Sequence, residues 1–275
     1  MIKPMLLKRL KIEELNTINQ DDYVVYEKYD GFRCLYENGK FYCRSNESWD
    51  KYFPEIHNEL NLNYKGCVFD GELINSDGIS KANILQQRLT TNKFMVGLMN
   101  GTYDKNIPAT LPATYMIFDI LEKDGISLRQ KPLSERFEVL LNTINETDSV
   151  KVVKPINMPI KEVFDRITGI GKEGIVIKKK DSKYIETEGT KRTMNWIKVK
   201  KYNETILKVT DYEITNSGLV LLSDNHRITC NGGQSKGVKN EIDNKGHCFC
   251  KIGFLEQNEK TGMYRMPVFV GVEYE

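Results

Sequence analysis

The chain has 275 residues, of which 40% are hydrophobic and 28% charged, ordinary values for a globular protein of one large domain or two modest ones. It has no run of about 18 apolar residues, so the sequence predicts no membrane-spanning helix. A net charge of +2 does not by itself indicate a nucleic-acid-binding protein. Residues 1–10 lack the long apolar segment and the small-residue cleavage site of a signal peptide, so we expect a cytoplasmic protein.

Between residues 22 and 200 the hydrophobic pattern predicts strands and amphipathic helices. Asn38 and Gly39 lie between two β-rich runs and predict a tight hairpin, because both tolerate positive φ. One helix is expected to begin near Pro54, and Ser80 and Ser134 are expected to cap two others. The expected strands are 22–29, 32–36, 40–44, 66–74, 113–121, 150–153, 173–178 and 196–200, and the expected helices are 53–60, 80–91, 134–144 and 160–167.

The pattern of expected elements changes after Lys201, from strands and helices to short strands. Five short strands are expected in the rest of the chain, at 205–213, 219–223, 226–230, 247–254 and 268–274. Short strands at this density, separated by turn residues, predict a small β-barrel. We therefore divide the chain into domains 1–201 and 202–275. The polar, lysine-bearing segment 232–246 is expected to be a loop, either a grip on duplex nucleic acid or a disordered connector.

Two compositional features allow more than one interpretation. The cations of 178–180 and 191–201 form either a solvated face or a strip for phosphates. The six cysteines are expected to be reduced thiols. Residues 247–250 (HCFC) invite a zinc interpretation, but the alternation of Cys248, Cys250 and Ile252 favours one face of a strand.

The first group of candidate catalytic residues lies at 27–33 (EKYDGFR). At the end of a strand Lys28 and Asp30 are expected to point to one side and Tyr29 into a core, because side chains alternate. Gly31 lets the chain turn, so that Arg33 returns on the next strand. A lysine surrounded by cationic groups has a lowered pKa and can act as a nucleophile. The short pattern K-x-D-G is weak on its own.

Four further segments follow in order: DGEL at 70–73, YMIFDI at 115–120, EGIVIK at 173–178 and WIKVK at 196–200. Ile175 and Ile177 are expected to face away from the acid and the lysine that bound their strand. Strict alternation places Lys198 and Lys200 on one face. Together the segments supply what nucleotidyl transfer needs: a nucleophile, metal-binding carboxylates, a base-stacking ring, a ribose acceptor and cations for a triphosphate.

These five segments, in this order, resemble the motif series of the covalent nucleotidyltransferases, the superfamily of ATP-dependent DNA ligases, RNA ligases and mRNA capping enzymes. The resemblance spans Lys28 to Lys200, and WIKVK is typical of DNA ligases. Residues 261–269 also resemble the end of compact phage and viral DNA ligases. The resemblance implies an α+β fold: a nucleotidyltransferase (DNA ligase adenylation) domain of antiparallel sheets and helices, followed by a β-barrel OB-fold.

The resemblance also implies a function. It predicts an ATP-dependent DNA ligase that seals 3′-OH/5′-phosphate nicks in duplex DNA through a lysyl-AMP intermediate, acting as a monomer with Mg²⁺ or Mn²⁺. By the same resemblance Lys28 is the nucleophile, and the other catalytic residues are Asp30, Arg33, Lys198 and Lys200. The ATP site is implied to comprise Glu27, Lys28, Arg33, Glu72, Phe118, Lys178, Lys198 and Lys200. Glu72 would hold the ribose and Phe118 would stack on adenine. Glu173 and Glu72 are the implied metal ligands, and Arg44 and Ser45 the implied DNA contacts.

Three alternatives remain at this point. An RNA ligase or a capping guanylyltransferase would share the superfamily motifs, and a non-catalytic OB-fold protein would share the nucleic-acid partner. The chain also departs from the family at its end, because residues 269–275 are acidic where the last family motif is basic. Arg265, Lys236 or Lys239 is expected to orient pyrophosphate instead.

Overall fold

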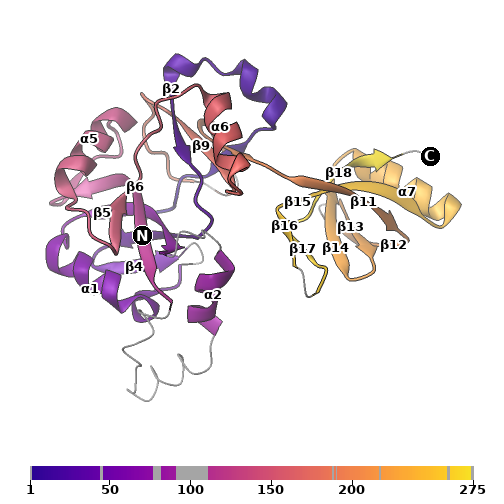
Figure 1. Ribbon diagram of the computed structural model, residues 1–275, viewed down its shortest axis with the longest axis horizontal. Helices are drawn as coiled ribbons and strands as arrows, with labels where there is room; N and C mark the ends of the chain where they lie inside the picture. The colour runs from indigo at the N-terminus through magenta and orange to yellow at the C-terminus, as the bar shows by residue number, and fades with distance from the viewer. Residues whose placement is uncertain are drawn as a thin grey trace. The chain divides into compact units, whose positions relative to one another are not determined.

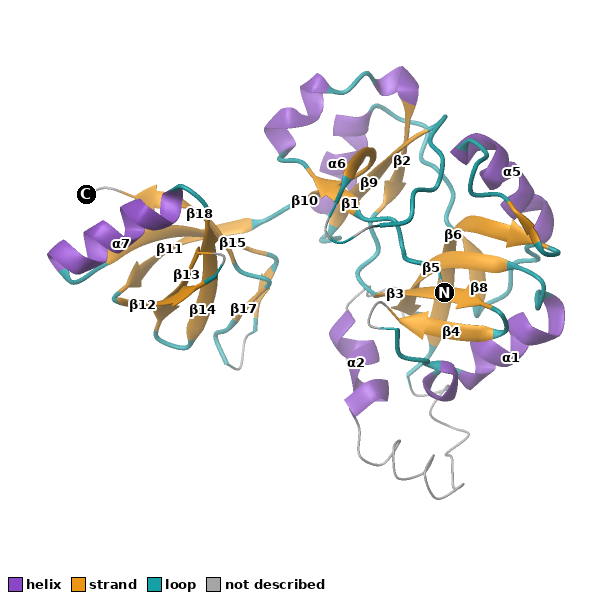
Figure 2. Ribbon diagram, turned by 180° about the vertical axis from the view of Figure 1, so that it is seen from behind, coloured by secondary structure: helices purple, strands orange, loops and turns teal. Residues whose placement is uncertain are grey.

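The computed structural model describes residues 2–43, 46–76, 82–90, 111–187, 189, 191–216, 218–258 and 261–273. The chain divides into two compact units, Met1–Lys200 and Lys201–Glu275 (Figures 1 and 2). Each unit has buried hydrophobic clusters of its own. None of the helices in the described ranges is both long and apolar enough to cross a membrane.

The first sheet of the first unit has four strands in the order β1 (Leu7–Arg9), β10 (Thr193–Lys200), β9 (Gly174–Lys179) and β2 (Tyr23–Glu27). One face of this sheet shares a buried cluster with the amphipathic helix α6 (Ile160–Gly169). Ile175 and Ile177 of β9 are fully buried in that cluster, which confirms the predicted alternation. The opposite face of β9 is left for other side chains.

The second sheet has six strands, with the order β4 (Lys40–Cys43), β3 (Phe32–Glu37), β5 (Val68–Asn75), β6 (Ala113–Lys123) and β7 (Ile126–Ser127), and β8 (Val150–Val152) paired with β6. The predicted hairpin is confirmed: Asn38 (φ 52°) and Gly39 (φ 74°) join β3 to β4. The sheets are mainly antiparallel as expected, except that β8 pairs with β6 and β1 with β10 in parallel. Parallel pairing needs a long connection, and helix α5 (Leu133–Thr143) lies between β6 and β8 in the chain.

The predicted helices are present with shifted ends. Helix α1 (Pro54–Asn63) begins at the predicted proline, and α2 spans Ala82–Thr90. Ser80, the expected cap of α2, lies outside the described residues. Ser134 does not cap α5, because Pro132 precedes the helix and the Ser134 N–H donates to the Lys180 carbonyl (3.1 Å). Three short 3-10 helices were not predicted: η1 (Ile12–Thr17), η2 (Gln20–Asp22) and η3 (Asp50–Tyr52).

In its described residues, the second unit contains two three-stranded sheets, a two-stranded ribbon and one helix. Its elements are β11 (Asn203–Val209), β12 (Asp211–Thr215), β13 (Gly218–Ser223), β14 (His226–Asn231), α7 (Gln234–Lys245), β15 (Cys248–Phe254), β16 (Glu256–Gln257), β17 (Tyr264–Arg265) and β18 (Val268–Glu273). The sheet orders are β11-β15-β18 and β12-β13-β14. Cys248, Cys250 and Ile252 are buried in one cluster, which confirms the strand interpretation of this segment.

Two predictions for this unit are wrong. The strand expected at 205–213 is two strands, β11 and β12, which belong to different sheets. The expected loop 232–246 is helix α7. Val238 and Ile242, four residues apart, are buried in the core of the unit, and Gly246 (φ 76°) ends the helix in the left-handed conformation. These two apolar residues are enough to hold a polar segment as a helix, because packing on the core, and not intrinsic helix propensity, stabilises it.

Candidate active site

The face of β2, β9 and β10 that does not pack on α6 carries its side chains in rows set by the strand register. The rows are Val24–Lys178–Trp196, Tyr26–Val176–Lys198 and Gly174–Lys200. The pairing of β2 with β9 continues beyond β2, because the Lys28 N–H donates to the Gly174 carbonyl (2.9 Å). Lys28, Lys198 and Lys200 therefore gather toward one end of this face, and Lys178 lies toward the other.

Glu173 joins two of these lysines. The Lys28 Nζ donates to Glu173 Oε2 (2.7 Å) and to the Tyr29 carbonyl (3.3 Å), and Lys200 forms an ion pair with Glu173 Oε1. The side chains of Glu173 and Lys200 are each only 5% exposed, so water screens these charges weakly. Glu173 thus holds the amine of Lys28 in place from the start of β9.

Among the protein groups around Lys28, the carboxylates outweigh the lysines that were expected, together with a metal ion, to lower its pKa. Burial acts to lower it, but the carboxylates of Glu173 and Glu72 raise the pKa of Lys28 above its ordinary value. The expected crowding by cations instead lowers the pKa of the neighbouring Lys198. Burial, Lys200 and Lys28 lower the pKa of Lys198 to about 8, and burial also lowers the pKa of Lys200. The nearest charged partner of Lys28 is the carboxylate of Glu173, and for this reason the pKa of Lys28 is raised.

The predicted metal ligands face a common region without forming a complete metal site. Glu173 is engaged with Lys28 and Lys200, and Glu72 lies near enough to Glu173 for their charges to interact. Burial raises the pKa of Glu72 to about 7, opposed by Lys28 and Arg33. Within the described residues no group of three or more His, Cys, Asp and Glu side chains is arranged to hold a metal. Two carboxylates fit an Mg²⁺ that arrives with substrate phosphates.

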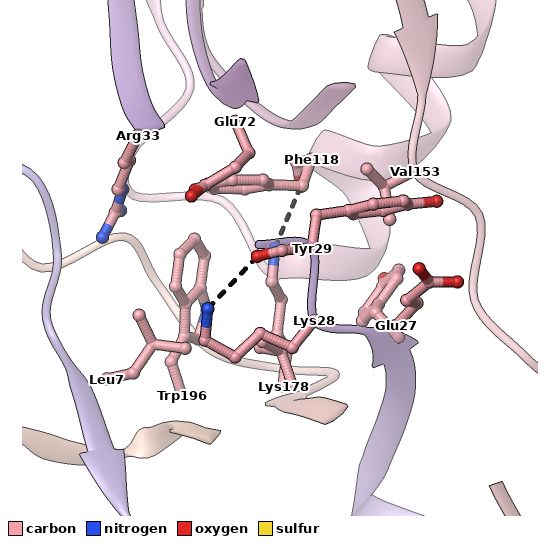
Figure 3. Close-up of a pocket in the computed structure, with 12 residues that line it drawn as sticks. Leu7, Glu27, Lys28, Tyr29, Arg33, Glu72, Phe118, Val153, Lys178 and Trp196 are labelled. Carbon is pink, nitrogen blue, oxygen red and sulfur yellow. Dashed lines mark hydrogen bonds between the residues drawn. The ribbon is translucent and has the colours of Figure 1, made fainter. Parts of the chain in front are cut away.

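A narrow cavity of about 70 Å³ lies beside the rows of this sheet. Phe118 of β6 and Trp196 are among the residues that line it (Figure 3), and Val176 lines it too. Tyr29 also lines this cavity, and its partly buried side chain packs against the core cluster of Tyr26, Met116 and Val153, so the prediction that it points into a core is confirmed in part. β2 ends at Glu27, and the strict alternation on which that prediction depended does not extend to Tyr29. The cavity is mostly aromatic and apolar, as a site for a flat base would be.

Lys178 lies at the Trp196 end of this cavity. Its side chain is almost fully buried, and its Nζ donates to the Phe118 carbonyl (3.0 Å; Figure 3). The Nζ is 4.3 Å from the centre of the Phe118 ring and 4.0 Å from that of Trp196. Along β9 it is two rows away from the position beside Lys200. The register therefore separates Lys178 from the other lysines of the expected triphosphate site.

Arg33 is held by protein partners. Its Nε and NH2 donate to the two oxygens of Asp70 (2.9 and 2.5 Å), and its NH1 donates to the Met5 carbonyl (2.6 Å). The Tyr184 hydroxyl donates to Asp70 (2.7 Å) and accepts from the Met5 N–H (3.1 Å). Met5 and Tyr184 were not predicted as site residues, and no local pattern marks a pair separated by 179 positions. Trp196 was missed too, although its alternation with Lys198 and Lys200 could have found it.

A second, wider cavity of about 460 Å³ shares Leu7, Lys28, Arg33 and Glu72 with the first. Its other charged lining residues are Lys3, Arg192 and Lys198, all cations. The predicted DNA contacts Arg44 and Ser45 follow Cys43, which lines this cavity, but they lie outside the described residues. The wider cavity is therefore a cationic site that meets the aromatic one at Lys28.

The remaining predicted residues also lie in this region. Asp30 is buried, and its charge acts on both Lys28 and Lys200. Glu27 lines the aromatic cavity, but its carboxylate is paired with Lys172 (2.6 Å). The geometry thus brings a lysine amine, flanking lysines and two carboxylates beside an aromatic slot. That combination defines a site for the transfer of a nucleotide through a lysine.

Comparison with known proteins gives the family. The model of the ATP dependent DNA ligase domain matches residues 4–200. The DNA ligase-like protein LigB from the SPbeta prophage of Bacillus subtilis is 31% identical over 218 residues, which are 77% of this chain and 72% of that protein. The DNA ligase of Archaeoglobus fulgidus is 29% identical over 65% of this chain and 32% of its own length. The chain belongs to the ATP-dependent DNA ligase family.

Solved structures agree on the fold. A Lig E DNA ligase superposes with a TM-score of 0.66 at 19% identity, covering 99% of this chain and all of the other. The Chlorella virus DNA ligase-adenylate superposes with a TM-score of 0.54 at 19% identity, over 100% of this chain and 99% of that one. The family is one of enzymes, and its members seal nicks in DNA with ATP. Several relatives are much longer than this chain, which spans about a third or less of their length.

Proposed function

We propose that this chain seals nicks between a 3′-OH and a 5′-phosphate in duplex DNA, with Lys28 as the carrier of AMP. The observation that carries the proposal is the junction of the two cavities at Lys28, Arg33 and Glu72. A nucleotide bound in the aromatic cavity can load Lys28. The AMP on Lys28 is then accessible to a phosphate in the cationic cavity.

In the loading step the Lys28 Nζ attacks the α-phosphorus of ATP, an N–P bond forms and pyrophosphate leaves. The adenine stacks on Phe118, the ribose hydroxyls bind Glu72, and Lys198 and Lys200 neutralise the charge that develops on the phosphate. A bound Mg²⁺ would supply further positive charge at Glu173 and Glu72. Because Glu173 pairs with the Lys28 ammonium, the amine becomes nucleophilic when this carboxylate changes partners and the ammonium releases its proton to solvent.

In the later steps the nick 5′-phosphate attacks the lysyl-AMP, and the 3′-OH then displaces AMP to close the strand. The cationic cavity, with Lys3, Arg192 and Lys198, supports a position for this phosphate. Arg44 and Ser45 are proposed to contact the same strand. Asp30 is proposed to orient the 3′-OH. Arg33 is proposed to hold the lysine and the nick ends in position relative to each other.

The second unit is proposed to be an OB-fold. Its two three-stranded sheets around one core support that proposal. We accordingly propose an adenylation domain at 1–201 and an OB-fold domain at 202–275. A monomeric state and a cytoplasmic location stay predictions from the sequence.

Incubation with α-labelled ATP and Mg²⁺, followed by a chase with nicked duplex DNA, tests the function directly. We expect a labelled adduct on Lys28 that disappears as the nick is sealed. Lys28→Ala should abolish the adduct, because no other amine occupies the junction of the cavities in the described structure, and should leave the unfolding temperature within about 2 °C.

The matched control is Lys161→Ala, which removes an amine that is 65% exposed on α6 and should leave adduct formation unchanged. Retained adduct in Lys28→Ala, or a label donated by GTP in place of ATP, would contradict the proposal. Nicked RNA in place of nicked DNA distinguishes an RNA ligase.

A further inference from the structure

The ammonium of Lys178 lies among aromatic rings. Its Nζ is 4.0 Å from the ring centre of Trp196, 4.3 Å from that of Phe118 and 5.1 Å from that of Tyr26. Phe118 and Trp196 meet edge to face, with their centres 5.8 Å apart. A cation against a ring face is attracted by the negative potential of the π electrons. Lys178 is thus bound to the Phe118 ring, and through the carbonyl to the Phe118 main chain.

Two buried Arg–Asp pairs lie near enough to this ammonium for their charges to act on it. Arg136 of α5 pairs with Asp119 of β6 through two 2.8 Å bonds, and Arg33 of β3 pairs with Asp70 of β5. Each pair is neutral overall, so Lys178 adds one positive charge that no carboxylate of its own balances. A buried charge of this kind costs stability, and an apolar side chain of similar volume would cost less. The position therefore indicates a role in the site.

We propose that Lys178 is a positioning residue for the base: its ammonium fixes the Phe118 ring and main chain in the orientation in which adenine stacks, and it does not bind the triphosphate. This inference rests on the proposed function, because it takes Phe118 as the adenine platform. The strand register supports it. Val176, which lines the same cavity, lies one row nearer to Lys28, and Lys178 closes the slot beyond it.

The charge state of Lys178 gives the proposal a pH signature. Burial lowers the pKa of Lys178 to about 7, Asp119 and Asp70 oppose this shift, and Arg33 and Arg136 add to it. The Tyr26 hydroxyl, whose ring also contacts the ammonium, has a raised pKa because of burial and Asp119 and stays neutral near pH 7. Glu72, which lines the same cavity, has a pKa of about 7 and contributes to the pH profile of the wild type and of both variants alike. Since the ammonium holds the ring, affinity for the base should be full below pH 7 and fall as the pH rises through 7.

Binding of the two halves of ATP separates the possible roles. Dissociation constants of adenosine and of inorganic tripolyphosphate are measured by calorimetry on the full chain for the wild type, Lys178→Met and Lys178→Arg. We expect Lys178→Met to weaken adenosine binding about tenfold, as loss of a desolvated cation–π contact would, and to leave tripolyphosphate binding within about twofold. Lys178→Arg should restore most of the adenosine affinity. Its affinity should also change less between pH 6 and 8.5 than that of the wild type, because a guanidinium stays charged and Glu72, whose pKa is about 7, is then the group at the ribose that still titrates.

Three results would overturn the proposal. Weaker tripolyphosphate binding with unchanged adenosine binding would make Lys178 a phosphate ligand. Tighter adenosine binding in Lys178→Met, or at high pH in the wild type, would mean that the ammonium obstructs the slot. Adenosine binding that is the same in all three proteins and at every pH would leave no positioning role. If Lys178→Met does not fold, the pH profiles of the wild type and Lys178→Arg decide. The adduct assay on the wild type separates failure of this inference from failure of the proposed function.

Discussion

At the scale of single residues, the ion pair of Lys28 with Glu173 differs from the surroundings that the sequence predicted. The sequence predicted a nucleophile made reactive by surrounding cations. The structure instead pairs Lys28 with Glu173, which also binds Lys200. The raised pKa of Lys28 favours the protonated, unreactive amine. In the proposed loading step, the Glu173 carboxylate therefore has to exchange partners.

The aromatic platform gives a prediction at the same scale. Phe118→Ala removes the ring that lines the cavity and contacts Lys178. Because stacking of a base on an aromatic ring is worth about 1–3 kcal/mol, the KM for ATP in adduct formation should rise about tenfold or more. The rate at saturating ATP should change much less, since the phosphate end of the site is untouched. An unchanged KM would show that Phe118 is only a core residue.

At the scale of elements, β9 carries both the core and the site. Ile175 and Ile177 are buried on one face, and Val176 and Lys178 line the cavity on the other. The start of the strand is constrained by close approach to β10. Gly174 has a φ of 147°, and a Cβ there would lie 2.1 Å from the Val199 carbonyl oxygen. Only glycine lets β9 begin here with Glu173 facing the lysines.

Gly174→Ala should therefore destabilise the chain by about 3 kcal/mol and abolish most adduct formation, because β9 must move away from β10 beside Glu173. Denaturant unfolding and the labelled-ATP assay measure the two effects. Gly169→Ala is the matched control, since its added Cβ meets nothing within 4 Å, and it should be neutral or slightly stabilising. Equal stability of the two variants would contradict this account of Gly174.

At the scale of the whole molecule, the chain is two units with separate cores. The second unit buries Val238 and Ile242 of α7 together with Cys230, Cys248 and Cys250 of its strands. This explains how a polar segment becomes a helix. It also means that a cavity made in this core removes contacts from the second unit alone.

Val238→Ala should lower the stability of the second unit by roughly 2 kcal/mol through the cavity it leaves. Calorimetric unfolding should show one transition shifted and the other unchanged. Ile214→Ala, at a side chain that is 73% exposed on β12, should shift neither. An equal shift of the whole unfolding curve in Val238→Ala would mean that the two units unfold as one cooperative body.

The sequence by itself determined the local parts of this protein: the Asn38–Gly39 hairpin, the alternation of β9 and β10, and the motif residues that give the family. These follow from strand periodicity and turn chemistry, which act over a few positions. Only the tertiary structure decided the charge of Lys28, the burial of Lys178 among rings and the bond network from Met5 through Tyr184 to Asp70 and Arg33. Those outcomes depend on distances of a few ångströms between different segments of the chain, up to 179 positions apart, and no local pattern encodes them.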